Sequence, residues 1–141
     1  MTVAAANPED RPLADDEATL VRWLLEHGNP DAANFLVQLA DARVVSRCPC
    51  GCASIDFAVG GSVPLAGAGM HILSDYQWQA ADGAQFGVFV FARAGLLAGL
   101  EVWSVDGLAS ASALPAVEQL QPLVFAQGLT SSAAVTAADR I

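Results

Sequence analysis

Hydrophobic positions follow a helical period near the start of the chain and a two-residue period in its middle. The apolar positions from Leu20 to Leu25 recur at intervals of three and four residues, which predicts one buried helical stripe. Asp15–Glu17 precede this stripe and Gly28 follows it, as is typical of a helix start and a helix stop. Asn29-Pro30 favours the start of a second helix that ends near Asp41. The two segments predict an N-terminal helical hairpin.

Runs of β-branched and aromatic residues follow from residue 43 onward and predict strands. The predicted strands cover residues 43–48, 53–59, 70–79, 85–93 and 96–105. Asp82-Gly83 is a strong hairpin turn signal, and Ala94-Gly95 separates the last two strands in the same way. The sequence therefore predicts an α+β fold, in which the helical hairpin is followed by an antiparallel sheet of about five strands.

Length and composition indicate one domain with less regular ends. The chain has 141 residues, of which 54% are hydrophobic, and this is enough to bury a single core. We expect a flexible lead over residues 1–13, a single α+β domain over residues 14–125 and a flexible tail over residues 126–141.

The charge balance excludes some classes of partner. Six Arg, no Lys and 15 acidic residues give a formal net charge of −9. Binding to a nucleic-acid backbone or to an anionic membrane needs a basic surface, so neither partner is expected. The sequence shows no basic and apolar leader and no unbroken apolar run of about 20 residues, and a cytoplasmic location is expected.

One predicted strand is apolar on both faces. In residues 85–93, Val88 and Val90 share one face, while Phe89 and Phe91 share the other. Two short helices cover about one face of such a sheet, so the second face needs another cover. Three covers remain open: the chain's own C-terminal segment, a second copy in a homodimer, or a ligand in a pocket. The expected residues of such a pocket or interface are Asp56, Trp78, Phe89, Phe91, Glu101 and Trp103.

Asp56 and Glu101 lie within predicted strands, where an acidic residue is unusual. Two carboxylates across a sheet can serve general acid–base catalysis, or they can lie on a solvated face and pair with Arg43, Arg47 or Arg93. The second explanation needs no substrate, so an enzyme is not favoured and no catalytic residue is assigned. The leading hypothesis is a non-catalytic binding or protein-interaction module, homodimeric, with a protein or a small molecule as a further partner.

Three cysteines fall within five residues, as Cys48-Pro49-Cys50-Gly51-Cys52. Pro and Gly in this order favour a tight turn between two predicted strands, which brings the thiols together. An odd number of cysteines, in a chain without a visible export signal, argues against a framework of structural disulfides.

Three interpretations of this thiol cluster remain open. The thiols can be small hydrophobic residues of a turn, as free cysteines often are. They can bind a soft metal such as Zn²⁺ or Cu(I), with His27 or His71 completing a tetrahedral site. They can also be redox-active or nucleophilic, since Arg47 stands next to them. A thiol-based metal-binding or redox protein is therefore the alternative function, with zinc as the alternative cofactor and Cys48, Cys50 and Cys52 as its ligands.

Residues 47–56 (RCPCGCASID) and residues 100–107 (LEVWSVDG), followed by Leu114-Pro115, form two motifs. With them the chain resembles a family of small uncharacterised proteins from high-GC bacteria, in which a helical N-terminus precedes the Cys-Gly-Cys segment. The resemblance covers residues 15–122 approximately, and the cysteine segment is its most specific part. The family carries no assigned activity, so the resemblance implies no catalytic residue. It implies that Cys50-Gly51-Cys52 and Glu101-Val102-Trp103 are the segments in which to seek a function.

Overall fold

The computed structural model describes residues 7–65, 67–107 and 111–122 of the chain. The expected flexible tail, residues 126–141, and residues 1–6 of the expected lead lie outside the described residues. Within the described ranges, no helix is both long enough and apolar enough to cross a membrane.

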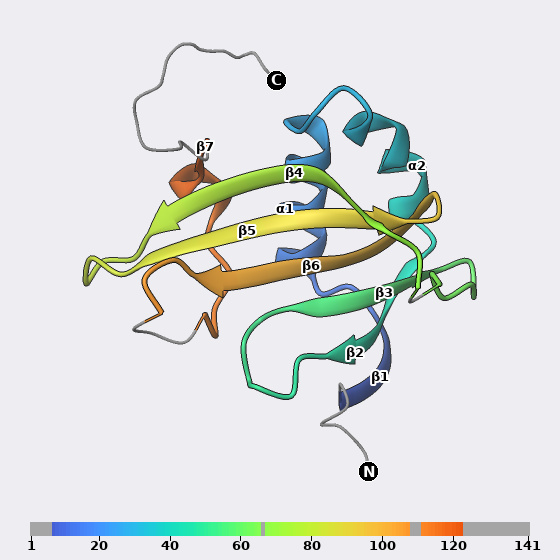
Figure 1. The fold of residues 1–141 in the computed structure, drawn as a ribbon, viewed down its shortest axis with the longest axis horizontal. Coiled ribbons are helices and arrows are strands. Elements are labelled where there is room, and N and C mark those ends of the chain that lie inside the picture. Colours follow the sequence, from blue (N-terminus) through green and yellow to red (C-terminus); the bar gives the residue numbers. More distant parts are fainter. Residues whose placement is uncertain (1–6, 66, 108–110, 123–141) are drawn as a thin grey trace.

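The fold is one antiparallel sheet with short helices on one face (Figure 1), so the predicted α+β class is confirmed. Its strands stand in the spatial order β1-β2-β3-β6-β5-β4-β7. They are β1 (Asn7–Pro12), β2 (Ala42–Arg47), β3 (Ile55–Val59), β4 (Met70–Gln79), β5 (Gln85–Arg93), β6 (Leu96–Ser104) and β7 (Gln121–Pro122). The helical elements are α1 (Asp15–Glu26), the 3-10 turn η1 (Ala32–Phe35), α2 (Leu36–Leu39) and the 3-10 turn η2 (Val117–Gln119).

The prediction of about five strands is too low, because the described sheet has seven. All five predicted strands are present as β2 to β6, and β1 and β7 extend the sheet at its two edges. β1 comes from the expected lead and is held by ion pairs at 2.8 Å, from Arg11 to Glu17 and from Arg43 to Asp10. Neither edge strand carries a hydrophobic alternation, so a search by periodicity does not find them.

The predicted helical hairpin is wrong in its second arm. α1 forms as predicted, but η1 and the single turn of α2 replace the second long helix. The Asn29 side chain accepts a hydrogen bond from the Asp31 N–H at 3.0 Å and donates one to the Ile72 carbonyl at 3.0 Å. These bonds close a tight turn and tie it to β4, and residues 32–41 that follow form a 3-10 turn and a single α-helical turn in place of one continuous helix.

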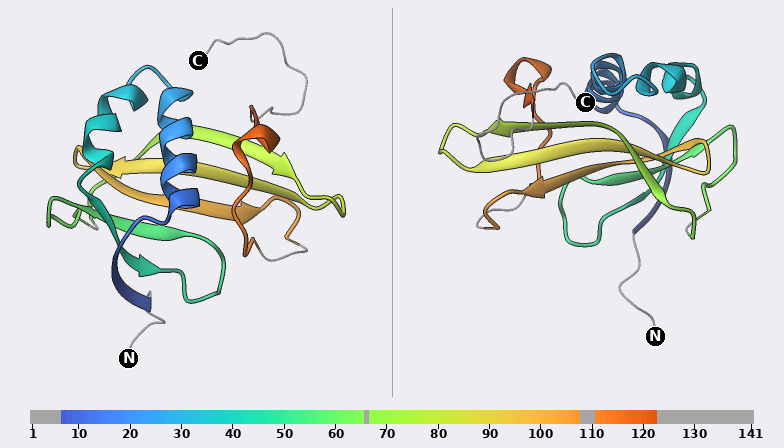
Figure 2. Two further views of the ribbon diagram at one scale, coloured as in Figure 1. Left: turned by 180° about the vertical axis from the view of Figure 1, so that it is seen from behind. Right: turned by 45° about the horizontal axis from the view of Figure 1, so that its top comes forward.

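All the described helical elements lie on one face of the sheet, which we call the helix face (Figure 2). The C-terminal segment packs there too, since Ala111, Leu114 and Val117 join the core that the helices form with the sheet. The described part of the C-terminal segment therefore does not cover the second face, which we call the open face. The buried core of the helix face includes Leu20, Val21, Leu24, Leu25, Val44, Leu73, Val88, Val90, Leu97, Leu100 and Val102.

Candidate functional site

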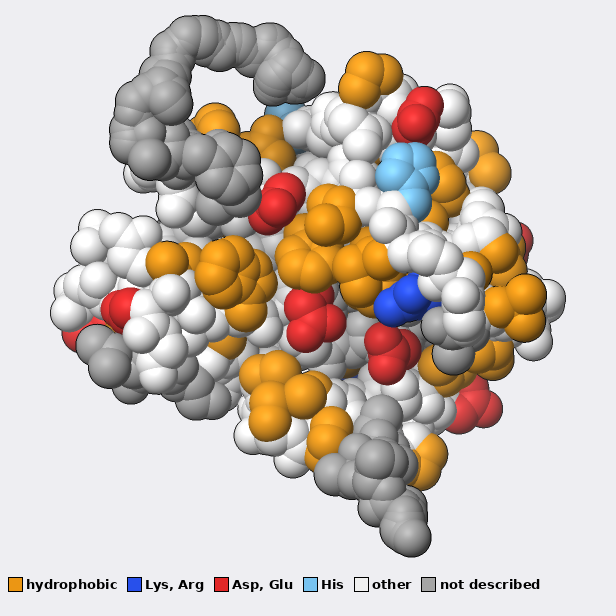
Figure 3. Space-filling view, in the orientation of Figure 1, with side chains coloured by type: hydrophobic (Ala, Val, Ile, Leu, Met, Phe, Trp, Pro, Cys, Tyr) orange, Lys and Arg blue, Asp and Glu red, His pale blue; other side chains and the backbone are white. Residues whose placement is uncertain are grey.

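The strand register brings acidic and aromatic side chains together on the open face. Asp75 of β4 and Glu101 of β6 both lie directly opposite Phe89 of β5, one on each side. Residues opposite each other in antiparallel strands point to the same face, so the three side chains form one row. In the neighbouring row, Asp56 of β3 lies opposite Gly99 of β6. Figure 3 views this face, and hydrophobic side chains gather at its centre with acidic side chains among them.

Two aromatic rings of the open face each lie over a glycine of the neighbouring strand. A Cβ atom on Gly99 would lie 2.8 Å from a ring carbon of Phe91, and a Cβ on Gly87 would collide with the indole of Trp103. Phe91 is only 3% exposed as a result, and its ring centroid lies 5.8 Å from that of Phe89. The open face therefore covers part of its own apolar surface by placing rings over glycines.

Other apolar side chains of this face stay in contact with solvent. Ile72 is 42% exposed, Met70 is 44% exposed and Trp103 is 37% exposed, while Phe89 is half-buried. Exposed apolar groups that share one face are typical of an interaction surface, whereas single ones need no explanation.

Burial raises the pKa values of two acidic groups of the open face, Asp75 and Glu101. Asp75 is half-buried, and its Oδ1 atom is buried without a hydrogen-bond partner among the described residues. This burial raises the pKa of the Asp75 carboxyl to about 6, because desolvation disfavours the charged form. Burial also raises the pKa of Glu101; the Ser54 hydroxyl opposes this shift and the nearby charge of Asp56 adds to it.

A basic group and a cavity lie at one end of the open face. The Arg93 guanidinium lies 5.4 Å from the centroid of the Phe91 ring and donates a hydrogen bond to the Ala68 carbonyl at 2.7 Å. Among the described residues, Arg93 has no ion-pair partner. Arg93 and Asp56 both line a cavity of about 300 Å³ together with Val63 of the loop between β3 and β4. The face therefore carries charges of both signs beside its apolar centre.

An Asp75→Asn substitution is expected to stabilise the fold by about 1 kcal/mol at pH 8, after allowance for solvent screening. A carboxyl whose pKa rises from 3.8 to about 6 on folding holds its proton more tightly in the native state. The parent protein therefore loses stability as the pH rises through this interval, and the asparagine variant does not. Urea unfolding at about pH 4 and pH 8 measures the difference, which should be several-fold smaller at the lower pH, close to the ordinary pKa of the carboxyl. An equal effect at both pH values would contradict the assignment.

The cysteines lie in the loop between β2 and β3, residues 48–54. The Gly51 N–H donates to the Cys48 carbonyl at 3.3 Å, and Gly51 adopts a φ of 90°, so the expected tight turn is present. A second hydrogen bond closes the loop, from the Cys48 N–H to the Ser54 carbonyl at 3.2 Å. The backbone thus holds the three cysteine side chains at one place.

The three sulfur atoms lie within 4.8 Å of one another. The Sγ atoms of Cys48 and Cys50 are 2.9 Å apart, and the Cys52 N–H points to the Cys50 sulfur at 3.4 Å. Hydrogen bonds from Cys48, and then from Cys52, lower the pKa of Cys50, and the same contact with Cys50 raises the pKa of Cys48. Cys50 is exposed and Cys52 is buried. The cluster therefore offers one accessible thiol with a lowered pKa, next to two partly or fully covered thiols.

Other predicted site residues lie elsewhere. Trp78 is on the helix face, where it is 6% exposed and stacks on Phe86 with 5.1 Å between ring centroids. His27 stacks on Trp23 at 4.1 Å, and His71 lies 3.8 Å from Asp31. Neither histidine belongs to the group of metal-ligating side chains that the cysteines form.

Sequence reasoning missed Asp75 as a member of the open face. A two-residue turn at Asp82-Gly83 would place Asp75 opposite Val90, on the helix face, whereas the chain makes a three-residue loop in which Ala80 pairs with Ala84. This loop shifts the register by one residue and places Asp75 opposite Phe89 on the open face. The pairing of glycines with aromatic residues across strands was missed too, because it depends on the register between β5 and β6.

No protein-family model, no curated protein and no solved structure matches the chain. The resemblance to a bacterial family with the same cysteine segment therefore stays a prediction.

Proposed function

We propose that the chain is a non-catalytic protein-interaction module that pairs with a second copy of itself through the open face. The observation that carries the proposal is the row Asp75, Phe89 and Glu101, which no described element covers, although helices and the C-terminal segment pack on the helix face. Pairing would bury the exposed side chains of Ile72 and Trp103, and removing apolar surface from water stabilises association.

The charges on the open face favour a second copy as the occupant. A two-fold axis brings the same surface of both copies together, so a face that carries both signs can complement itself. Arg93, which has no ion-pair partner among the described residues, shares the face with Asp56, Asp75 and Glu101. In a homodimer, Arg93 of one copy can meet a carboxylate of the other.

The perturbed carboxyls make the pairing pH-dependent. The acidic groups outnumber Arg93 on this face, so two ionised faces repel each other in part. Asp75, with a pKa of about 6, becomes neutral as the pH falls, and a neutral carboxyl can donate a hydrogen bond across the interface. Dimerisation is therefore expected to take up protons and to strengthen below about pH 6. Binding of a cationic partner protein would instead weaken as the pH falls, because protonated carboxyls no longer attract positive charge.

Sedimentation equilibrium of the full chain at about pH 5 and about pH 8 tests the proposal. We expect a dimer whose dissociation constant falls at least about tenfold between pH 8 and pH 5, which corresponds to one coupled protonation of a shifted carboxyl. A monomer at micromolar concentration at both pH values, or a dimer that strengthens as the pH rises, would contradict it.

Matched variants locate the interface. Phe89→Asp places a charge at the centre of the open face and is expected to abolish the dimer. Val37→Asp makes a similar change at a side chain that is 77% exposed in α2, away from this face, and should leave the dimer intact. Circular dichroism checks that both variants fold. Loss of the dimer in Val37→Asp but not in Phe89→Asp would place the interface elsewhere.

A further inference from the structure

The cysteine loop takes no part in the proposed pairing and has the geometry of a soft-metal site. Its three sulfur atoms lie within 4.8 Å of one another. Three sulfurs bound to one ion at about 2.3 Å in a plane are about 4 Å apart, so small side-chain rotations suffice to reach this arrangement. The Cys48 and Cys50 sulfurs, now 2.9 Å apart, have to separate slightly.

The surrounding backbone holds the ligands in place before an ion arrives. The Gly51 N–H closes the turn by donating to the Cys48 carbonyl, and Ala53, which follows Cys52, donates its N–H to the carbonyl of Ala111 at 2.8 Å. Cys52 is buried in the main core, so its sulfur is fixed relative to the sheet. Cys50 is exposed and leaves a path from solvent. Such a preformed site reduces the ordering that binding requires.

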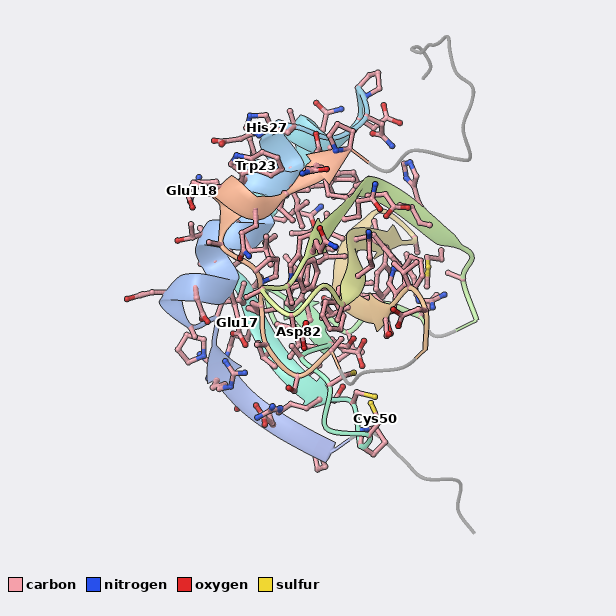
Figure 4. The ribbon with its side chains drawn as sticks, turned by 90° about the vertical axis from the view of Figure 1, so that its left-hand side faces the viewer. Glu17, Trp23, His27, Cys50, Asp82 and Glu118 are labelled. Carbon is pink, nitrogen blue, oxygen red and sulfur yellow. The ribbon has the colours of Figure 1, made fainter. Side chains whose placement is uncertain are left out.

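The donor set selects the kind of ion. Thiolate sulfur is a soft ligand and prefers Cu(I) or Zn²⁺ to hard ions. Structural zinc takes four protein ligands, whereas Cu(I) is satisfied by two or three thiolates. Among the described residues, no histidine or carboxylate joins the three cysteines as a fourth ligand. Figure 4 shows Cys50 and His27 at opposite ends of the molecule.

We propose that Cys48, Cys50 and Cys52 bind one monovalent copper ion through three sulfur atoms. Each thiol that binds releases its proton to solvent, and copper stays monovalent, so the step needs no oxidant or reductant.

Competition for Cu(I) tests the proposal. The reduced full-length protein is titrated without oxygen into the coloured complex of Cu(I) with bicinchoninate, in the presence of a phosphine reductant. We expect the protein to remove one copper ion per chain. The same titration with Zn²⁺ and a chromogenic zinc chelator is expected to show binding at least about 100-fold weaker than that of copper, because only three ligands are offered.

Serine variants identify the ligands. Loss of an outer-shell partner costs about 10- to 100-fold in metal affinity, so loss of a ligand is expected to cost at least about 100-fold. Cys48→Ser and Cys50→Ser are the informative changes, because Cys52 is buried and its substitution can disturb folding. Met70→Leu is the matched control, since it removes an exposed sulfur at the far end of β4.

Three results would overturn the proposal: no removal of copper from bicinchoninate, unchanged affinity in Cys50→Ser, or a Zn²⁺ affinity equal to that for copper. The outcome is independent of the dimer. The Phe89→Asp variant, which lacks the proposed interface, should bind copper as the parent does, so failure of one proposal is distinguishable from failure of the other.

Discussion

A Gly99→Ala variant is expected to lose about 2 kcal/mol of free energy of unfolding, although it adds only one methyl group. The new Cβ would lie 2.8 Å from the Ile55 carbonyl oxygen and 2.8 Å from the ring of Phe91. The ring can rotate away only by exposing itself, and the carbonyl belongs to the backbone that joins β3 to β6. Urea unfolding measures the loss.

Gly69→Ala is the matched control for this change. A Cβ atom on Gly69 meets nothing within 4 Å, and its φ lies outside the left-handed region. Replacing such a glycine restricts the unfolded chain and changes stability by less than about 1 kcal/mol, in the stabilising direction. Equal stability of the two alanine variants would show that Phe91 does not lie over Gly99.

A Ser54→Ala variant is expected to lose about 2 kcal/mol of free energy of unfolding, because it leaves buried backbone groups without partners. The Ser54 hydroxyl accepts a hydrogen bond from the Val102 N–H at 2.8 Å and donates one to the Val102 carbonyl at 3.2 Å. Ser54 is 5% exposed and Val102 is 2% exposed, so water cannot replace the lost bonds. Thermal and urea unfolding measure the change.

The same variant should loosen the cysteine loop, because the Ser54 carbonyl also accepts the hydrogen bond from the Cys48 N–H. We therefore expect faster alkylation of the buried Cys52 thiol. Ser112→Ala, at an exposed position of the C-terminal segment, is the control for stability and for labelling. If the two alanine variants unfold alike and label alike, the Ser54 hydroxyl has no role in joining the strands.

The sequence predicts those elements whose stability comes from a periodic apolar face. α1 and the strands β2 to β6 bury regular positions, so their periods are visible before folding. β1 contains two prolines and three charged residues. Its place in the sheet depends on the ion pairs of Arg11 with Glu17 and of Asp10 with Arg43, which form only in the folded chain. The second helix was overestimated because the hydrogen bonds of Asn29 to β4 connect residues far apart in the chain.

Only part of the candidate site could be predicted, because the register between β5 and β6 is irregular. A regular hairpin about Ala94-Gly95 would place Glu101 opposite Val88, on the helix face. A bulge between Phe91 and Ala92 shifts the pairing, so that Glu101 lies opposite Phe89 on the open face instead. The pattern of apolar and polar residues does not predict this bulge. The cysteine turn, by contrast, is local, and Pro49 and Gly51 are sufficient to predict it.

The narrow connection between β3 and β6 has a consequence for how the molecule fluctuates. The two strands pair only at Ile55 with Leu100 and at Asp56 with Gly99, whereas β4, β5 and β6 pair along their length. Proteins open in cooperative units whose boundaries follow the weakest connections. We therefore expect opening of the sheet to begin at this boundary, between strands β1 to β3, whose connecting loop carries the thiols, and strands β4 to β7. Such an opening would expose the edges of β3 and β6 and leave the hydrogen bonds within each group of strands intact.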